Sequence, residues 1–274
     1  MESKRRQLFE QRGTLIGMVH VQALPGTPQQ QLELDAVVDR ACADAQRLLD
    51  AGFEALIVEN MHDRPYLRGA VGPEIVAAMT RVTLAVRELA PRLSLGVQVL
   101  AGANDAALSV ALAANADFVR AEGFVFASVA DEGLFDEASA GPVLRYRRAI
   151  GAQDIAVFAD IKKKHSAHAL TADVDLAETA RAAFFCGADG VIVTGVATGA
   201  AADPGEVAAV RNAVGDAPVL VGSGVTPENA SAFVAGSDGL IIGSSIKPDG
   251  DWRRDVDPAR AAAMVAAVQA ARRR

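Results

Sequence analysis

Eight short apolar runs recur along the chain, and a helical pattern separates each run from the next. The runs are nearly continuous in apolar residues, as expected of parallel strands that helices cover. Eight strands close a β/α barrel, for which about 250 residues is typical, and this chain has 274. The sequence therefore predicts an α/β fold, a single (β/α)8 TIM barrel domain over residues 1–274, with strands at 15–19, 55–59, 95–99, 117–120, 155–160, 190–194, 219–222 and 239–243.

Two segments stand outside this repeating pattern. Residues 1–12 are expected to form an N-terminal extension or helix, and residues 121–147 form a long connection between the fourth strand and the next helix. Connections of that length are uncommon in compact domains and often act as lids or binding loops. We interpret this one either as a lid or as an exposed helical excursion without a function.

The composition disfavours several classes of partner. The formal net charge of −7 argues against nucleic acid, because binding to phosphate backbones needs clustered cations. The only cysteines, Cys42 and Cys186, have no metal-ligand spacing and suit a reduced cytoplasm. The charged N-terminus is not followed by a long apolar stretch, so neither a signal peptide nor a membrane span is predicted. We expect a cytoplasmic protein without membrane insertion, and we also expect a homo-oligomer.

The last two predicted strands each end in a glycine–serine turn. Bare glycines let backbone N–H groups close on an anion, serine hydroxyls add donors, and barrels bind phosphate after strands 7 and 8. A helix expected to begin at Thr226 would direct its positive end at the same place. The alternative is that the glycines only turn the chain. The turns favour a barrel of the phosphate-binding type, with a small phosphorylated ligand held by Gly222, Ser223, Gly224, Gly243, Ser244 and Ser245.

Polar side chains gather where the other strands end, at the C-terminal face that carries the active groups of such barrels. All four histidines fall just after predicted strands, although a buried histidine often only satisfies hydrogen bonds. The predicted catalytic residues are His20, Glu59, Asp160, Lys162 and Thr194. The candidates for substrate contact are Asn60, Gln98, Arg120, Glu122 and His165.

Asp160 and Lys162 are two residues apart on one predicted strand, so alternation predicts that their side chains share a face. In a closed pocket this pair is suited to position a phosphorylated or carbonyl substrate, or to shuttle a proton. Lys162 is also a candidate for a Schiff base. We interpret the next two lysines, Lys163 and Lys164, as solvated or anion-attracting.

A divalent metal is an open alternative, and no other cofactor is indicated. Nitrogen and carboxylate ligands are available, but no local spacing such as His-Glu-x-x-His defines a site. Glu59 is alternatively a structural acceptor at the barrel mouth. The candidate ligands are His20, Glu59, Asp63, Asp160 and His165.

A series of segments, in order and nearly from end to end, resembles the BtpA/SgcQ family. The Ala-Glu-Gly-Phe and Lys-Lys-Lys-His segments are more similar to the SgcQ branch than to the cyanobacterial BtpA proteins. The matching segments lie at 17–28, 56–60, 78–80, 98–104, 118–124 with 131–133, 144–147, 159–165, 193–195, 222–224 and 242–245.

The resemblance implies a β/α barrel similar to the phosphate-binding barrels, and two different roles. BtpA proteins are linked to the biogenesis of photosystem I at the thylakoid, whereas SgcQ-like members occur in bacterial sugar-utilisation settings. Residues 61–63 here replace the tyrosine-containing Asn-Tyr-x-Asp pattern that is more usual in the BtpA branch, which argues against the photosystem role. The family supplies no established catalytic residues.

We therefore expect an enzyme that acts on a small phosphorylated metabolite, above all a sugar phosphate, by isomerisation, epimerisation or aldolase-like acid–base chemistry. One alternative is a non-catalytic assembly or biogenesis factor for a membrane complex, which needs an apolar surface patch rather than a pocket with perturbed titrating groups. A second alternative is a nucleotide hydrolase, although the chain lacks a Gly-x-x-x-x-Gly-Lys-Ser/Thr loop.

Overall fold

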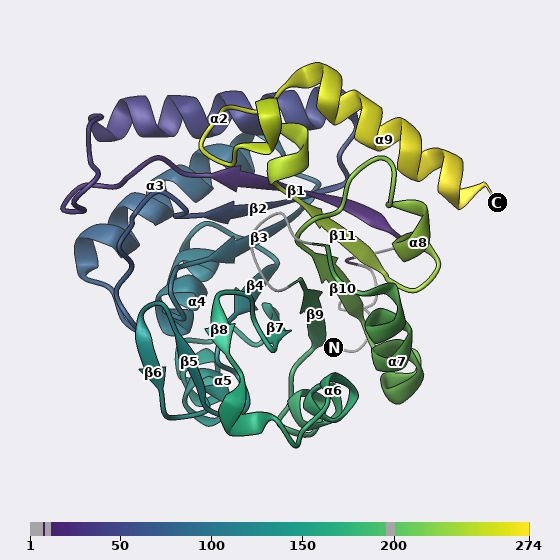
Figure 1. Cartoon of the computed structure of the whole chain (residues 1–274). Coiled ribbons are helices and arrows are strands. Elements are labelled where there is room, and N and C mark those ends of the chain that lie inside the picture. The colour runs from purple at the N-terminus through teal and green to yellow at the C-terminus, as the bar shows by residue number, and fades with distance from the viewer. Residues whose placement is uncertain (1–7, 9–11, 196–200, 274) are drawn as a thin grey trace.

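Eight parallel strands close into a barrel in the computed structural model, which describes residues 8, 12–195 and 201–273 (Figure 1). The segment 1–12 lies outside the described residues, apart from Leu8 and Arg12. Every predicted strand is present, and each end lies within one residue of its predicted position. The barrel strands are β1 (Thr14–His20), β2 (Ala55–Glu59), β3 (Ser94–Gln98), β4 (Phe118–Ala121), β7 (Ala156–Ile161), β9 (Gly190–Thr194), β10 (Val219–Gly222) and β11 (Gly239–Ile242).

Helices surround the barrel and cover its outer surface (Figure 1). Among the described residues, no helix has both the length and the apolar character that a membrane span requires. The helices are α2 (Leu34–Ala51), α3 (Pro73–Leu89), α4 (Asn104–Ala113), α5 (Ala140–Ala149), α6 (Leu176–Phe185), α7 (Pro204–Val214), α8 (Ser231–Val234) and α9 (Pro258–Arg272), with short 3-10 turns η1 (Ala169–Thr171), η2 (Ser244–Ile246) and η3 (Pro248–Gly250).

Alternate strand residues fill the interior of the barrel, where Phe118 and Phe158 are the bulkiest side chains of the inner cluster. Gly96 and Gly190 on neighbouring strands make room for them. A Cβ atom on either glycine would lie 2.3 Å from the facing phenyl ring. Because this interior is packed, polar groups are confined to the layer where the strands end.

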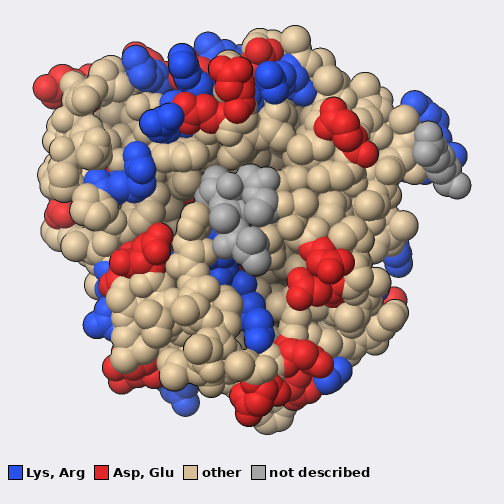
Figure 2. All heavy atoms as spheres, in the orientation of Figure 1, with Lys and Arg blue, Asp and Glu red and all other residues tan. Residues whose placement is uncertain are grey.

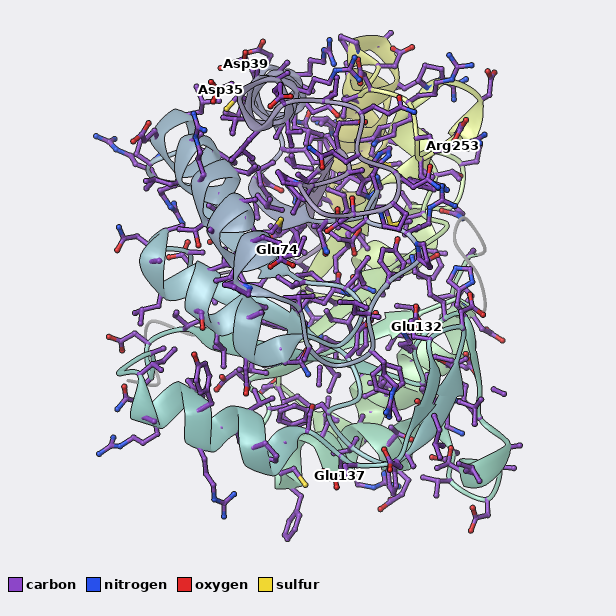
Figure 3. All side chains as sticks on the ribbon, turned by 90° about the vertical axis from the view of Figure 1, so that its left-hand side faces the viewer. Asp35, Asp39, Glu74, Glu132, Glu137 and Arg253 are labelled. Carbon is purple, nitrogen blue, oxygen red and sulfur yellow. The ribbon has the colours of Figure 1, made fainter. Side chains whose placement is uncertain are left out.

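The segment 121–147 contains a hairpin and, from Ala140, the first turns of α5. Its strands β5 (Ser128–Ala130) and β6 (Gly133–Phe135) pair, and β8 (Ser166–Ala167) adds to β5, which makes a small antiparallel sheet. Lys163, just after β7, pairs with Glu132 in the hairpin turn at 3.5 Å. In the side view of Figure 3, Glu132 and Arg253 lie toward the same end of the molecule. The hairpin therefore stands at the mouth of the barrel.

At the opposite end of the barrel, the same arrangement of a carboxylate, a backbone N–H and an arginine occurs four times. Asp189, just before β9, accepts the backbone N–H of Val157 on β7 at 2.9 Å and pairs with Arg147 of α5 at 2.6 Å. Each such carboxylate joins a neighbouring strand to a covering helix. The other three groups are Glu54 with Leu15 and Arg272, Asp117 with Leu95 and Arg87, and Asp238 with Val219 and Arg211.

Replacing Asp189 with alanine should destabilise the fold by about 3 kcal/mol, because it leaves the largely buried Arg147 guanidinium without its carboxylate and the Val157 N–H without an acceptor. The matched control is Glu178→Ala, which breaks an ion pair with Arg181 in which both side chains are about half exposed and should change stability by about 1 kcal/mol or less. Urea unfolding measures both values. Equal losses in the two variants would contradict a special role for the buried group.

Candidate active site

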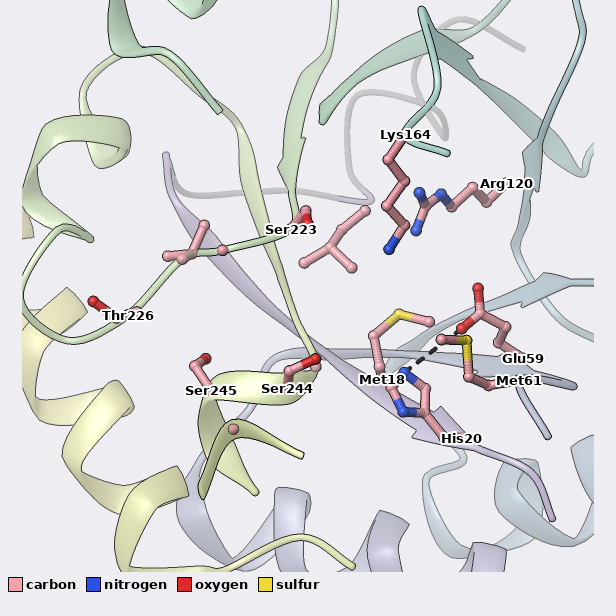
Figure 4. A pocket seen from close by; sticks show the side chains of 15 residues that line it. Met18, His20, Glu59, Met61, Arg120, Lys164, Ser223, Thr226, Ser244 and Ser245 are labelled. Atoms are coloured by element: carbon pink, nitrogen blue, oxygen red, sulfur yellow. Dashed lines mark ion pairs between the residues drawn. The ribbon is translucent and has the colours of Figure 1, made fainter. Parts of the chain in front are cut away.

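Two adjoining cavities open at the C-terminal mouth of the barrel. The first has a volume of about 230 Å³ and lies among the ends of β1, β2, β4, β10 and β11 (Figure 4). The second, of about 250 Å³, lies over β2, β3 and β4. Glu59, Met61, Arg120 and Lys164 line both cavities. A ligand that spans the two cavities therefore passes these four side chains.

Backbone and hydroxyl groups of two loops form one wall of the first cavity. This serine wall consists of Ser223 and Gly224 after β10, and residues 243–245 after β11. Ser223 and Gly224 have φ angles of 73° and 63°, so the chain turns sharply there. At Gly243, a Cβ atom would lie 3.3 Å from the imidazole of His20, so glycine leaves room for the ring. Gly222 does not line the cavity.

The prediction that a helix begins at Thr226 is wrong. The helix α8 begins at Ser231 and has four residues. Before it, the Thr226 N–H donates to Asn229 Oδ1 at 2.8 Å, and Asn229 Nδ2 donates to the Gly224 carbonyl at 2.9 Å. Asn229 thus shapes the turn. A single helical turn supplies little of the dipole expected at this wall.

Arg120 on β4 and Asp160 on β7 form a buried bidentate ion pair. Arg120 Nε donates to Oδ1 at 3.0 Å and Nη2 donates to Oδ2 at 2.8 Å. Burial alone would lower the pKa of the guanidinium, but Asp160 outweighs burial and raises the pKa. Asp160 lines neither cavity at the mouth. The geometry gives it the role of holding Arg120 in place.

His20, at the end of β1, is held from behind by Lys247. Lys247 Nζ lies 3.1 Å from His20 Nδ1 and donates to the Trp252 carbonyl at 2.9 Å. Nδ1 also lies 3.3 Å from the Trp252 carbonyl, to which it donates in the other tautomer. While Lys247 is protonated, its ammonium only donates, so Nδ1 accepts and Nε2 carries the ring proton. Nε2 faces Glu59 Oε2 at 3.6 Å, as the dashed line in Figure 4 marks.

The surroundings shift the pKa values of His20, Lys247 and Glu59. Burial, followed by the charge of Lys247, lowers the pKa of His20 well below its usual value. Burial also lowers the pKa of Lys247 to about 8. The pKa of Glu59 is raised by burial, against the opposing effects of Arg120 and Lys164. A neutral imidazole beside a carboxyl of raised pKa is suited to exchange protons with a ligand.

The second cavity carries acids, bases and an aromatic ring. Gln98 Nε2 and Lys163 Nζ both donate to Glu122, each at 3.3 Å. Gln98 Oε1 is buried and has no partner within the described chain. Trp252 lines this cavity, with the Arg64 guanidinium 4.6 Å from its ring. Figure 2 shows basic atoms at the centre of this face and charges of both signs around its rim.

Asp160 and Lys162 line one cavity, as their spacing predicts, but this cavity is small and separate from the two at the mouth. The strand β7 ends at Ile161 and Lys162 has a φ of 48°, so strand alternation stops before it. Lys162 Nζ donates to the Thr171 carbonyl at 3.1 Å and lines a separate small cavity. Lys164 lines both cavities at the mouth instead. Lys163 is buried between Glu122 and Glu132 rather than solvated.

Two of the other predicted residues support the loops. Asn60 Oδ1 accepts the Leu100 N–H at 2.7 Å, and Asp63 accepts from the Leu24 N–H and from Asn60 Nδ2, each at 2.8 Å. Neither these two nor Thr194 lines the cavities. His165 lines the second cavity from an exposed position. Over residues 12–195 and 201–273, no three His, Cys, Asp or Glu side chains are grouped as a metal site would require.

Lys247 and Trp252 were not predicted as site residues, and Lys164 was expected only to be solvated or to attract anions. Lys247 follows the short turn after the last strand, and no pattern in the adjacent sequence predicts that the residue is only 1% exposed. The one available signal was its position directly after the second glycine–serine turn.

Comparison with known proteins identifies relatives along the full length of the chain. The BtpA family model matches residues 11–270. An uncharacterized mitochondrial protein of Caenorhabditis elegans is 46% identical over 260 residues, which cover 92% of each chain. The photosystem I biogenesis protein BtpA of Synechocystis is 33% identical over 269 residues, which cover 96% of this chain and 90% of that protein.

Solved structures share the barrel at low identity. Thiamine phosphate pyrophosphorylase from Pyrococcus furiosus has a TM-score of 0.58 and 14% identity, and covers 97% of this chain and 98% of its own. The native KDPGal structure has a TM-score of 0.57 and 18% identity, with 95% and 96% covered. These similarities show the fold alone.

Replacing Lys247 with methionine should raise the pKa of His20, because the charge behind Nδ1 is lost while Glu59, Lys164 and His62 still surround the ring. A neutral buried histidine makes the folded state less stable as pH falls below about 6.5, where the unfolded chain takes up the proton. The variant should therefore lose less stability on acidification. An NMR titration of the imidazole nitrogens measures the pKa, with Lys162→Met as the control. An unchanged His20 pKa in a folded variant would refute this assignment.

Proposed function

The chain belongs to the BtpA family, and we propose that it is an enzyme that acts on a small sugar phosphate at the mouth of its barrel. One observation carries the proposal. The serine wall and the His20–Glu59 pair line the same cavity, so a site suited to an anion adjoins groups suited to proton transfer.

The charge of the first cavity favours an anion. Among the described residues that line it, Glu59 is the only carboxylate, whereas Arg120 and Lys164 both contribute positive charge. Asp160, which offsets Arg120, lies outside the lining. Backbone N–H groups and the hydroxyls of Ser223, Ser244 and Ser245 add donors at the far wall. A phosphate group satisfies both the charge and the donors.

The second cavity is suited to hydroxyl groups. Carboxylate oxygens of Glu122 and Glu132 and the unpartnered Gln98 oxygen are acceptors, and Lys163 is a donor. Trp252 offers an apolar face beside them. The size of each cavity is below the roughly 300–1,000 Å³ typical of sites for drug-sized ligands. Both properties favour a short polyhydroxylated metabolite with its phosphate at the serine wall.

Glu59 and His20 are assigned the acid–base work. Glu59 has the raised pKa and faces both cavities, so it is the group that moves a proton to or from the substrate. The neutral His20 donates from Nε2 and stabilises an oxygen on which negative charge develops. The reaction class is an isomerisation, an epimerisation or a carbon–carbon cleavage.

Assembly of a membrane complex is the second candidate, since a Synechocystis relative carries the name photosystem I biogenesis protein. An apolar row crosses the small sheet, where Val129 opposes Leu134 on β6 and Ala167 on β8. Val129 and Leu134 are 42% and 47% exposed. Isolated apolar side chains are common on monomer surfaces, so this row supports a docking role less strongly than the cavities support catalysis.

Phosphorylated sugars should bind more tightly than the same sugars without phosphate. Binding is measured by calorimetry and by the emission of Trp252, the single tryptophan of the chain. The variant Ser244→Ala should bind phosphorylated sugars about tenfold or more less tightly, since a hydrogen bond to a charged group contributes about 1.5–3 kcal/mol. The control Ser231→Ala, an exposed serine of α8, should bind normally. Equal affinity for the phosphorylated and unphosphorylated sugars would refute the phosphate site.

Glu59→Gln should reduce turnover by about 10²–10⁴-fold while ligand binding persists, because it keeps the shape of the side chain and removes its titration. The measurement is steady-state turnover of a sugar phosphate that the binding screen identifies. A variant with full turnover would remove Glu59 from the chemistry. If Val129→Ser with Leu134→Ser abolishes the cellular phenotype and Glu59→Gln leaves it intact, the assembly role replaces catalysis.

A further inference from the structure

Lysine is scarce in this chain and concentrated at the mouth of the barrel. Only five of the 27 basic residues are lysines, and four of these are Lys162, Lys163, Lys164 and Lys247. Arginine stays protonated, whereas a desolvated lysine can lose its proton and become a nucleophile. The mouth therefore holds nearly all the side-chain amines that the chain possesses.

Three of these four amines are engaged by neighbouring groups. Lys162 donates to a backbone carbonyl outside the two cavities. Lys163 lies between two carboxylates, and although burial acts to lower its pKa, these charges raise it. Lys247 is fully buried behind His20 and bonded to it. None of the three presents a free amine to a ligand.

Lys164 differs from all three. Within the described part of the chain, its ammonium makes no hydrogen bond and no ion pair. It lines both cavities, and in Figure 4 its side chain points into the first cavity beside the Arg120 guanidinium. Burial and then the charge of Arg120 lower its pKa. A larger share of this amine is unprotonated than is usual for lysine.

We propose that Lys164 forms an imine with an aldehyde or ketone group of the substrate. This inference rests on the proposed function and narrows its substrate class to phosphorylated carbonyl compounds. The carbonyl carbon would lie at the wall that the two cavities share, with the phosphate at the serine wall and the hydroxyls in the second cavity.

The chemistry balances with groups that the site already holds. The lone pair of the neutral Lys164 amine adds to the carbonyl carbon, and one of the two amine protons passes from the nitrogen to the former carbonyl oxygen to give a neutral carbinolamine. Glu59 supplies a proton to the departing hydroxyl, which leaves as water while the C–N bond becomes an iminium. The iminium draws electrons from the adjacent C–H or C–C bond, and the Glu59 carboxylate accepts the proton released. No oxidant or reductant is needed.

Pyridoxal 5′-phosphate is a direct probe because it carries both an aldehyde and a phosphate. The full-length protein is incubated with it, reduced with borohydride and mapped by peptide mass spectrometry. We expect the reduced adduct mainly on Lys164, at least tenfold above Lys162 and Lys163. Inorganic phosphate should slow the labelling, and pyridoxal, which lacks the phosphate, should label Lys164 at least tenfold less well.

Two variants control the result. Lys164→Arg keeps the charge but has no reactive amine, so it should lose the adduct at this position and still bind the probe non-covalently. Lys162→Met should retain the labelling of Lys164. A circular dichroism spectrum and a melting curve for each variant establish that it is folded.

The outcomes separate this inference from the proposed function. Two results would refute the imine but not the phosphate site. One is labelling spread evenly over the lysines, and the other is no adduct on Lys164 although phosphate competes for binding of the probe. Labelling of Lys164 to the same extent by pyridoxal and its phosphate, without competition by inorganic phosphate, supports the reactive amine and overturns the phosphate site.

Discussion

The arrangement of side chains at the barrel mouth depends on four carboxylate groups at the opposite, N-terminal end of the barrel. Each ties a strand to its neighbour and to a helix, and together they fix how neighbouring strands are staggered. The stagger decides which residues face inward, because a shift of one residue would turn every side chain of a strand to the opposite face. His20, Glu59, Gln98 and Arg120 occupy inward positions at the ends of their strands. The chemistry at one end of the barrel thus depends on ion pairs at the other.

Much of the fold and part of the site could be predicted from the sequence. Parallel strands covered by helices must be apolar on both faces, and such runs are visible without structural information. His20, Glu59 and Arg120 could be placed at the mouth because they directly follow apolar positions at the ends of predicted strands. The same reasoning placed the residues of the serine wall at the mouth, since glycine and serine follow both of the last predicted strands.

The errors arose where regular geometry stops. Alternation holds only inside a strand, and Lys162 has left the strand with a positive φ. Lys164 reaches the cavities because of this irregular turn, which no periodic pattern encodes. The partnership of Lys247 with His20 joins residues 227 positions apart. The helix after β10 was misplaced because an asparagine side chain, rather than continuous helical hydrogen bonds, organises that turn.

The arrangement of charge at the mouth limits where a reaction can take place. Asp160, from outside the cavity lining, offsets part of the charge of Arg120, and two glutamates offset the charge of Lys163. Of the two cations that line both cavities, Lys164 is the one without an ion pair among the described residues, and Glu59 is the acid of raised pKa beside it. Both line the two cavities, whereas the serine wall belongs to the first alone and Trp252 to the second. Under the proposed function, a sugar phosphate anchored at both ends would present its middle atoms to Lys164 and Glu59, and the reacting bond would lie within its carbon chain rather than at its phosphate ester.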